Sequence, residues 1–307
     1  MLRRLRKRIG LHPRAWLHGA LTYSRFMGRI KPTLLSGAEP EVHARLAALS
    51  HSLEPAELKV PIGKRLVAIA PHPDDESIGA GGLLLAHRGK ASLDIVTIFN
   101  GEGGGMLGAR PWVNEQSYRK ELVRARKGEL NEAAVRLQAG TVRALDLPDG
   151  YSIPNQHDAQ RLREQVETLR PDVVLIPWFL DDLPDHRMAN LLYASACADL
   201  DCMVLGMEIW TPCQPNAYFD ITPWQQEKLD LVRIYKTQLA TIDYERLVTG
   251  MALTRGFQMG SAPRRASAAE AFLALPNRDY CDIGRALYGT PGALSETAQR
   301  IFRRGPL

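Results

Sequence analysis

The sequence lacks the features that mark disulfide-rich, zinc-finger and membrane-spanning proteins. It has only four cysteines in 307 residues, and no two of them form a C-x-x-C pair, so free thiols are expected and a structural zinc site is not. No apolar run approaches the roughly 20 residues that span a bilayer, and the N-terminus has no continuous apolar core of a signal peptide. We therefore expect a cytoplasmic protein.

Acidic residues are missing from the first 31 positions. Nine of the 39 Lys and Arg residues lie in this segment, so the other 276 residues carry 30 basic against 34 acidic residues. Leu2, Leu5 and Ile9 recur at helical spacing among the arginines. This pattern favours peripheral contact with an anionic membrane, at the inner face of the cell membrane; a solvated or self-docked tail is the alternative. No nucleic-acid-reading module accompanies the charge, so nucleic acid is not expected as a partner.

The rest of the chain has the composition of a globular protein, with 45% hydrophobic and 24% charged residues overall. We expect residues 1–58 to form the basic arm and a linker, 59–290 the folded domain, and 291–307 a C-terminal tail. Apolar runs that suit buried strands alternate with helical segments in the domain. This alternation predicts an α/β fold, with a Rossmann-like, mostly parallel sheet and helices on both faces.

Polar clusters follow three of the expected strands. The strands are expected at 66–70, 93–99, 141–145, 173–176, 204–209 and 217–221. One helix is expected to start at the glycines near 79 and to end near 87. Further helices are expected at 115–138, 158–170, 223–238 and, in an Ala-rich segment, near 268–275. Ligands of open parallel sheets bind at the carboxyl ends of strands. The clusters at 72–76 and 181–186 contain histidines and predict the site, whereas 100–105 predicts a mobile loop. His87 and His157 are expected at the surface.

The most informative stretch follows the first strand of the domain. Pro71 and Pro73 flank His72, and three acids come next: Asp74, Asp75 and Glu76. Three consecutive acids at a strand end repel one another unless a cation lies among them; a solvated acidic turn is the alternative. The glycines at 79, 81 and 82 would let the following helix pack closely.

The spacing of these residues permits metal chemistry. His72 and Asp75 are three residues apart and can converge on one ion, and His186 at the other strand end can supply a third ligand. Two nitrogens and one oxygen leave a position open for water, which is the catalytic pattern for zinc. Asp74 is then a candidate general base. Glu76 is a candidate for fixing the orientation of a ligand.

Two other site types use some of the same residues. The ligand set also occurs in non-haem iron oxygenases, but those proteins usually place histidine and acid two residues apart on a β-barrel strand. A nucleotide-binding loop is disfavoured because Gly79, Gly81 and Gly82 do not complete the G-x-G-x-x-G fingerprint. The adjacent acids would also repel a pyrophosphate.

Two motifs together carry a family resemblance. Pro71-His72-Pro73-Asp74-Asp75-Glu76 and Pro184-Asp185-His186-Arg187 closely resemble the LmbE/PIG-L family of metal-dependent N-acetylglucosaminyl de-N-acetylases, over roughly residues 64 to 275. The resemblance implies a Rossmann-like LmbE fold and de-N-acetylation of an N-acetylated amino sugar.

The resemblance also implies roles for individual residues. His72, Asp75 and His186 would bind Zn²⁺, with Fe²⁺ as another divalent ion that suits them, and Asp74 would be the general base. Arg126 and Asp149 would bind sugar hydroxyls or a phosphate. An ordinary surface ion pair with Glu129 is the alternative for Arg126, and a turn-forming role is the alternative for Asp149.

One position departs from the family pattern. Members usually have His-Pro-Asp-His in the second motif, and Leu183 stands at the first of these positions. That histidine helps to polarise the acyl oxygen, so another group substitutes for it, or the metal suffices, or the protein is a weak enzyme or an inactive glycan-binding protein. Together with the basic arm, the resemblance predicts a membrane-linked glycan or a lipopolysaccharide precursor as substrate.

Overall fold

The computed structural model describes residues 55–104, 115–150, 153–259, 267–295 and 298–299. The basic arm, on which the expectation of membrane contact rests, lies outside these residues. In the part of the chain that is described, no helix combines the length and the apolar character needed to cross a bilayer.

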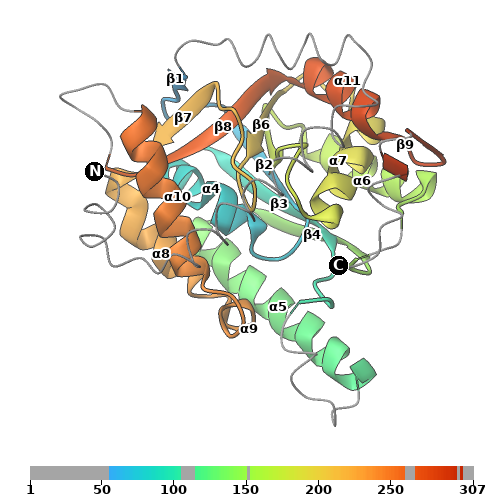
Figure 1. The fold of residues 1–307 in the computed structure, drawn as a ribbon, viewed down its shortest axis with the longest axis horizontal. Coiled ribbons are helices and arrows are strands. Elements are labelled where there is room, and N and C mark those ends of the chain that lie inside the picture. Colours follow the sequence, from blue (N-terminus) through green and yellow to red (C-terminus); the bar gives the residue numbers. More distant parts are fainter. Residues whose placement is uncertain (1–54, 105–114, 151–152, 260–266, 296–297, 300–307) are drawn as a thin grey trace, which may run out of the picture.

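An eight-stranded sheet lies at the centre of the molecule (Figure 1). In spatial order its strands are β1 (Ala56–Glu57), β7 (Ala217–Asp220), β8 (Ala269–Pro276), β6 (Met203–Met207), β5 (Val173–Pro177), β2 (Arg65–Ala70), β3 (Ser92–Phe99) and β4 (Thr141–Leu147). Neighbouring strands are parallel except where β8 pairs with β6 and β7. The structure therefore confirms the predicted α/β fold with a mostly parallel sheet.

Helices cover both faces of this sheet (Figure 1). On one face lie α4 (Asp75–His87), α5 (Glu115–Leu137), α8 (Gln225–Val232) and α10 (Tyr244–Met259); on the other lie α6 (Gln156–Leu169), α7 (Pro184–Ala196) and α11 (Asn277–Tyr288). Strand β2 shows why both helical layers form. Leu66 and Ala68 pack into the hydrophobic core under α4, and Val67 and Ile69 pack into the core under α6 and α7. A strand buried on both faces reads as a continuous apolar run.

The Ala-rich segment near 268–275, expected as a helix, is strand β8. Its residues pair antiparallel with β6 and β7, and its side chains reach both cores, Phe272 on one face and Leu273 on the other. Alanine prefers helices by less than about 1 kcal/mol per residue. Hydrogen bonds to two neighbouring strands and burial of two faces outweigh that local preference.

The segment 223–238, expected as one helix, is divided. A 3₁₀ turn (Thr222–Trp224) precedes α8, and a separate short helix, α9 (Lys236–Leu239), follows. Tyr235 lies between α8 and α9 with ψ 60°, outside the helical region, and its buried hydroxyl donates a hydrogen bond to Glu76. The break in the helix brings this side chain to the loop after β2.

Some elements lie beyond the expected boundaries of the domain. Strand β1 pairs with β7 before residue 59, and a hairpin of β9 (Gly289–Thr290) and β10 (Ala293–Leu294) spans the expected boundary at 290. Helix α11 was not anticipated. His87 was expected at the surface but is 1% exposed, and its Nε2 accepts a hydrogen bond from the Ile62 N–H at 3.0 Å.

The order of the strands determines where a ligand can bind. From β2 the chain proceeds to β3 and β4 on one side, and then crosses to β5 and β6 on the other side of β2. The carboxyl ends of β2 and β5 are therefore neighbours at a topological switch point, where open α/β sheets bind ligands. Helix α4 begins within the first predicted motif, and helix α7 begins with the second.

Helix α4 packs closely against its neighbours, as its glycines predict. Every residue of α4 is buried, and a Cβ on Gly79 would lie 2.7 Å from Met207 Sδ. The helix is kinked at Ala80, and the N–H groups of Gly82 and Leu83 donate to the Glu270 carboxylate at 2.7 and 2.8 Å. The carboxylate satisfies donors that the kink releases from the helical ladder.

The close approach predicts a stability effect. Gly82→Ala should lower the free energy of unfolding by about 1–3 kcal/mol, because the added Cβ would overlap Ile221. The matched control is Gly128→Ala in α5, where a Cβ would meet nothing within 4 Å; it should raise stability by about 0.5–1 kcal/mol. Urea denaturation of both variants checks this, and equal stability of the two would contradict it.

Candidate metal and catalytic site

The loop after β2 has an unusual backbone that several hydrogen bonds stabilise. Asp74 caps helix α4 with φ 135°, a region that residues with a Cβ rarely adopt. The Arg126 Nη2 donates to the Pro73 carbonyl at 2.8 Å, and the Asp74 N–H donates to Glu76 at 3.3 Å. Such strain costs about 1–3 kcal/mol and is common at functional sites. The conformation places the acids of the loop at the carboxyl end of the sheet.

The structure brings the three predicted ligands together. Asp75 Oδ2 lies 3.4 Å from His72 Nδ1 and 3.2 Å from His186 Nε2, and the three ligand atoms can surround one ion. Ligands about 2.0–2.2 Å from a tetrahedral ion lie about 3.3–3.6 Å from one another. The residues therefore fit a divalent ion such as Zn²⁺.

The surroundings of His186 support the same fit. Its side chain is fully buried, and within the described chain its Nε2 makes no hydrogen bond of regular geometry. Buried polar atoms without partners are rare in proteins and indicate a missing ligand or ion. A metal at Nε2 would satisfy the atom that points toward Asp75.

Strong electrostatic coupling links the three groups. Burial alone would lower the pKa of His186, but Asp75 and Asp181 outweigh it and raise that pKa to about 9. Burial alone would raise the pKa of Asp75, but His186 and His72 outweigh it and bring the pKa well below its usual range. The carboxylate therefore stays ionised between two imidazoles, where it attracts a cation.

Two aspartates that the sequence analysis did not nominate hold the histidines. Asp181 Oδ1 lies 3.0 Å from His186 Nδ1, and its Oδ2 accepts the backbone N–H of Trp210 at 2.9 Å. Asp185 Oδ2 lies 2.9 Å from His72 Nε2. Carboxylates in this position fix the tautomer and orientation of metal-binding histidines. The available sequence signal was their position, Asp185 within the second motif and Asp181 three residues before it.

His72, Asp149 and Asp185 form a second group whose atoms could surround an ion. The short distance from His72 Nε2 to Asp185 is typical of a hydrogen bond, and Asp149 Oδ2 is farther away, at 4.0 Å. His72 thus presents Nδ1 to the predicted ion and Nε2 to Asp185. The first group is the better metal site because both of its close contacts have the spacing of coordinated atoms.

Asp74 lies beside the triad without belonging to it. It is 3% exposed, and its Oδ2 lies 3.3 Å from Arg126 Nη2. Burial raises the pKa of Asp74 to about 8, although the Arg126 charge acts in the opposite direction. A carboxyl group with this proton affinity can both take up and release a proton near neutral pH.

The other predicted site residues are close by, in different contacts from those expected. The surface-pair alternative for Arg126 is wrong, because Arg126 is 3% exposed and Glu129 instead accepts hydrogen bonds from Thr237. Glu76 accepts hydrogen bonds from Ser77 and Tyr235 and has none from a predicted metal ligand. Its described contacts hold the loop and not a ligand side chain.

Asp149 fastens the segment that was expected to be a mobile loop. Its carboxylate accepts the N–H groups of Gly101 and Gly103 at 2.7 and 2.9 Å. The described part of this segment, residues 100–104, is therefore anchored beside the site. Residue 105 lies outside the described chain.

A cleft of about 480 Å³ opens over these groups. Its polar wall contains His72, Asp74, Asp75, Arg119, Arg126, Asp149, Asp185 and Gln238, and its apolar wall contains Leu183, Pro184, Trp210, Ile242 and Tyr244. A volume in this range, with a few convergent polar groups, is typical of small-molecule sites. Two of the predicted ligands, His72 and Asp75, share this cleft with the candidate base Asp74, and His186 lies buried behind Asp75.

Comparison with known proteins finds a family that matches part of the chain. Residues 67–197 match the PIG-L family, described as GlcNAc-PI de-N-acetylase. Over this range the chain is similar to that family. The matched range includes both motifs, from the loop after β2 to helix α7.

Proteins similar to this chain include some with different reactions. Diacetylchitobiose deacetylase of Thermococcus kodakarensis is 26% identical over 197 residues, 57% of this chain and 70% of the relative. N,N′-diacetylchitobiose deacetylase of Pyrococcus horikoshii has a TM-score of 0.59 at 21% identity, over 71% of this chain and 86% of that one. The 4-carboxy-2-hydroxymuconate hydratase of Pseudomonas putida has a TM-score of 0.56 at 22% identity, over 69% and 96%. The fold alone does not identify the reaction.

The contacts of Asp181 predict that its carboxylate supports metal binding. Asp181→Asn should weaken Zn²⁺ affinity about 10–100-fold, because an amide cannot accept all the hydrogen bonds that the carboxylate does. The neighbouring Asp182→Asn is the matched control, since the Asp182 side chain is 60% exposed and contacts Arg187. Competition with a chromophoric chelator measures both affinities, and equal values would show that Asp181 does not tune the site.

Proposed function

We propose that this protein is a metal-dependent hydrolase that removes the acetyl group from an N-acetylated amino sugar. The observation that carries the proposal is a buried acid, Asp74, next to a complete triad of His72, Asp75 and His186, of which His72 and Asp75 line the same cleft as Asp74. Metal-assisted amide hydrolysis uses a metal-activated water together with a base that is not itself a ligand. Relatives named as deacetylases of acetylated sugars support this choice over hydration.

The triad suits Zn²⁺, and Fe²⁺ is an alternative with the same donor set. When bound, the ion lowers the pKa of its water to about 7 and polarises the acyl oxygen. His72 and His186 supply nitrogen ligands, each with its other ring nitrogen within 3.0 Å of a carboxylate oxygen. Asp75 supplies the oxygen ligand.

Asp74 performs the proton transfers in this proposal. Its carboxylate takes a proton from the attacking water and returns it to the sugar nitrogen as the C–N bond breaks, so water and amide give amine and acetate. The Arg126 guanidinium holds the Asp74 carboxylate in place, with 3.3 Å between Nη2 and Oδ2. Asp149 anchors the backbone of Gly101 and Gly103 at the rim of the cleft, where sugar hydroxyls would bind.

Removing the base tests the proposal. Asp74→Asn should reduce amine release from N-acetylglucosamine-containing substrates about 10²–10⁴-fold, while zinc content and melting temperature stay near those of the unaltered protein. Asp146→Asn is the matched control, because Asp146 pairs with Lys127 at the surface. If protein with stoichiometric zinc releases no amine from any N-acetyl sugar offered, the proposed activity is wrong.

A second candidate function follows from Leu183. A cleft-lining leucine at the position of the usual histidine is compatible with a weak or inactive protein that binds glycans through the same cleft. Calorimetric binding of an N-acetyl sugar without amine release would support this alternative. Amine release at rates that depend on Asp74 would exclude it.

The basic arm supports a membrane-linked substrate, such as a glycolipid or a lipopolysaccharide precursor. Nine Lys and Arg residues and no acid occur in residues 1–31, and each basic residue near an anionic surface contributes about 1 kcal/mol. Full-length protein should therefore float with anionic liposomes, and a variant lacking residues 1–31 should not. Equal flotation of the two would remove the support for this substrate class.

A further inference from the structure

A hydrogen-bond donor to the acyl oxygen accelerates amide hydrolysis, and the position that usually provides one is occupied by Leu183. The leucine precedes helix α7 and lines the cleft with a side chain that cannot donate. A donor aimed at a developing oxyanion is worth about 10²–10³ in rate. The proposed function therefore raises the question of which group in this cleft takes that role.

Two donors of the cleft are already engaged. Arg126 donates from Nη1 to the Gly101 carbonyl at 3.1 Å and from Nη2 to Pro73 at 2.8 Å. The Gln238 amide donates to the Thr237 hydroxyl at 3.3 Å. Both groups hold the walls of the cleft together, and redirecting either one would break a contact within the protein.

Tyr244 differs from these donors. Its side chain lines the cleft together with Asp74 and Asp75 and is 5% exposed. In the described chain its hydroxyl has no hydrogen-bond partner. Burial and the charges of Asp74 and Asp75 raise the pKa of Tyr244, so the phenol keeps its proton and remains a donor.

The ring of Tyr244 is held in a fixed position. It packs edge-on against Trp210, with 5.8 Å between ring centroids and an interplanar angle of 62°. The backbone N–H of Trp210 donates to Asp181, whose carboxylate contacts His186. The aromatic pair is thus connected to the predicted metal site through one side chain.

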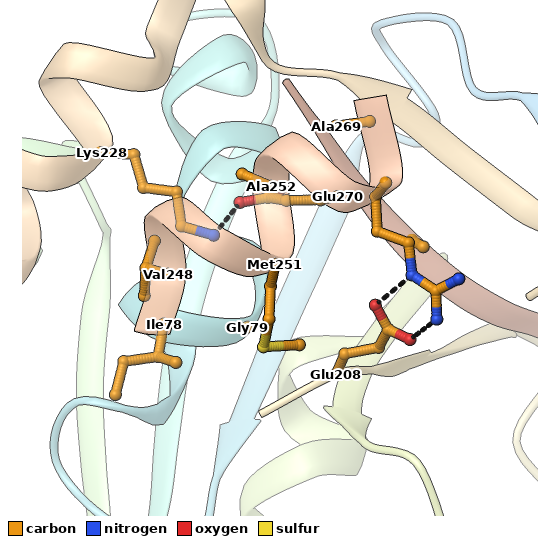
Figure 2. Close-up of a pocket in the computed structure, with 11 residues that line it drawn as sticks. Ile78, Gly79, Glu208, Lys228, Val248, Met251, Ala252, Ala269 and Glu270 are labelled. Carbon is orange, nitrogen blue, oxygen red and sulfur yellow. Dashed lines mark hydrogen bonds and ion pairs between the residues drawn. The ribbon is translucent and has the colours of Figure 1, made fainter. Parts of the chain in front are cut away.

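A buried ion pair also links the elements that carry Tyr244 and Trp210. Arg255 of helix α10 donates from Nε to Glu208 at 3.0 Å and pairs with it through Nη2. Glu208 lies two residues before Trp210. Figure 2 shows this ion pair at Glu208 and a second one, Lys228 with Glu270, around a small cavity. Helix α10, which begins at Tyr244, is therefore tied to the segment that carries Trp210.

We infer that the Tyr244 hydroxyl donates a hydrogen bond to the acyl oxygen as it becomes an oxyanion, in place of the side chain missing at residue 183. The inference rests on the proposed function and adds a catalytic residue to it. Tyr244 transfers no proton; it stabilises the negative charge while Asp74 carries the proton from water to the amine. A donor that is rigid and already oriented costs little reorganisation during the reaction.

Removal of one oxygen atom tests the inference. Tyr244→Phe should lower kcat for amine release by about 10²–10³ with a small change in KM, because the hydrogen bond strengthens in the transition state. The ring packing on Trp210 is kept, so the melting temperature should stay the same. Tyr218→Phe, on strand β7 and outside the cleft lining, is the matched control and should leave kcat unchanged.

A rescue variant separates a catalytic donor from a structural side chain. Leu183→His in the Tyr244→Phe background should recover at least tenfold in kcat. The same substitution in the unaltered protein should have a much smaller effect, since the donor is already present. A Tyr244→Phe variant that keeps full kcat, or a Leu183→His effect equal in both backgrounds, would overturn the inference.

Binding gives a readout that does not depend on turnover. A phosphonamidate analogue of N-acetylglucosamine has tetrahedral oxygens that mimic the hydrated amide, and its affinity for Tyr244→Phe should fall by the same factor as kcat. The affinity for N-acetylglucosamine itself should change little. If the unaltered protein releases no amine, the proposed function and this inference both fail; if it does and Tyr244→Phe matches it, only the inference fails.

Discussion

Four ionisable side chains follow strand β2 within five residues: His72, Asp74, Asp75 and Glu76. His72 is partly buried and the three acids are buried, so the structure depends on compensating their charges. Each acid has its own partner: Arg126 for Asp74, two histidines for Asp75, and Tyr235 for Glu76. Buried carboxylates without such partners would be strongly destabilising. The partners come from α5, α7 and the break between α8 and α9, so helices from both faces of the sheet converge on one loop.

This convergence accounts for features that are otherwise irregular. The helix near 235 breaks where Tyr235 reaches Glu76, and α4 kinks where Glu270 accepts the N–H groups of Gly82 and Leu83. In both places the irregular backbone supplies a buried carboxylate with further donors, Tyr235 for Glu76 and two N–H groups for Glu270. The irregularities are therefore part of how the acid-rich loop stays buried.

Local patterns predicted the centre of the site and the sheet. The motif around His72 is contiguous, and parallel strands bring their carboxyl ends together, so the approach of His186 followed from strand order. What could not be predicted depends on contacts between residues far apart in sequence. Strand β8 needs β6 and β7 to override the helix preference of alanine, and Arg126 faces Asp74 across 52 positions.

Asp181 joins two parts of the cleft that are usually considered separately. One carboxylate oxygen faces His186, and the other accepts the N–H groups of Trp210 and Thr211 at 2.9 and 3.1 Å. A displacement of the Trp210 segment therefore moves the carboxylate that orients a predicted metal ligand. The Asp181 carboxylate thus links the predicted ligand His186 to the backbone segment that carries Trp210, a residue of the cleft wall.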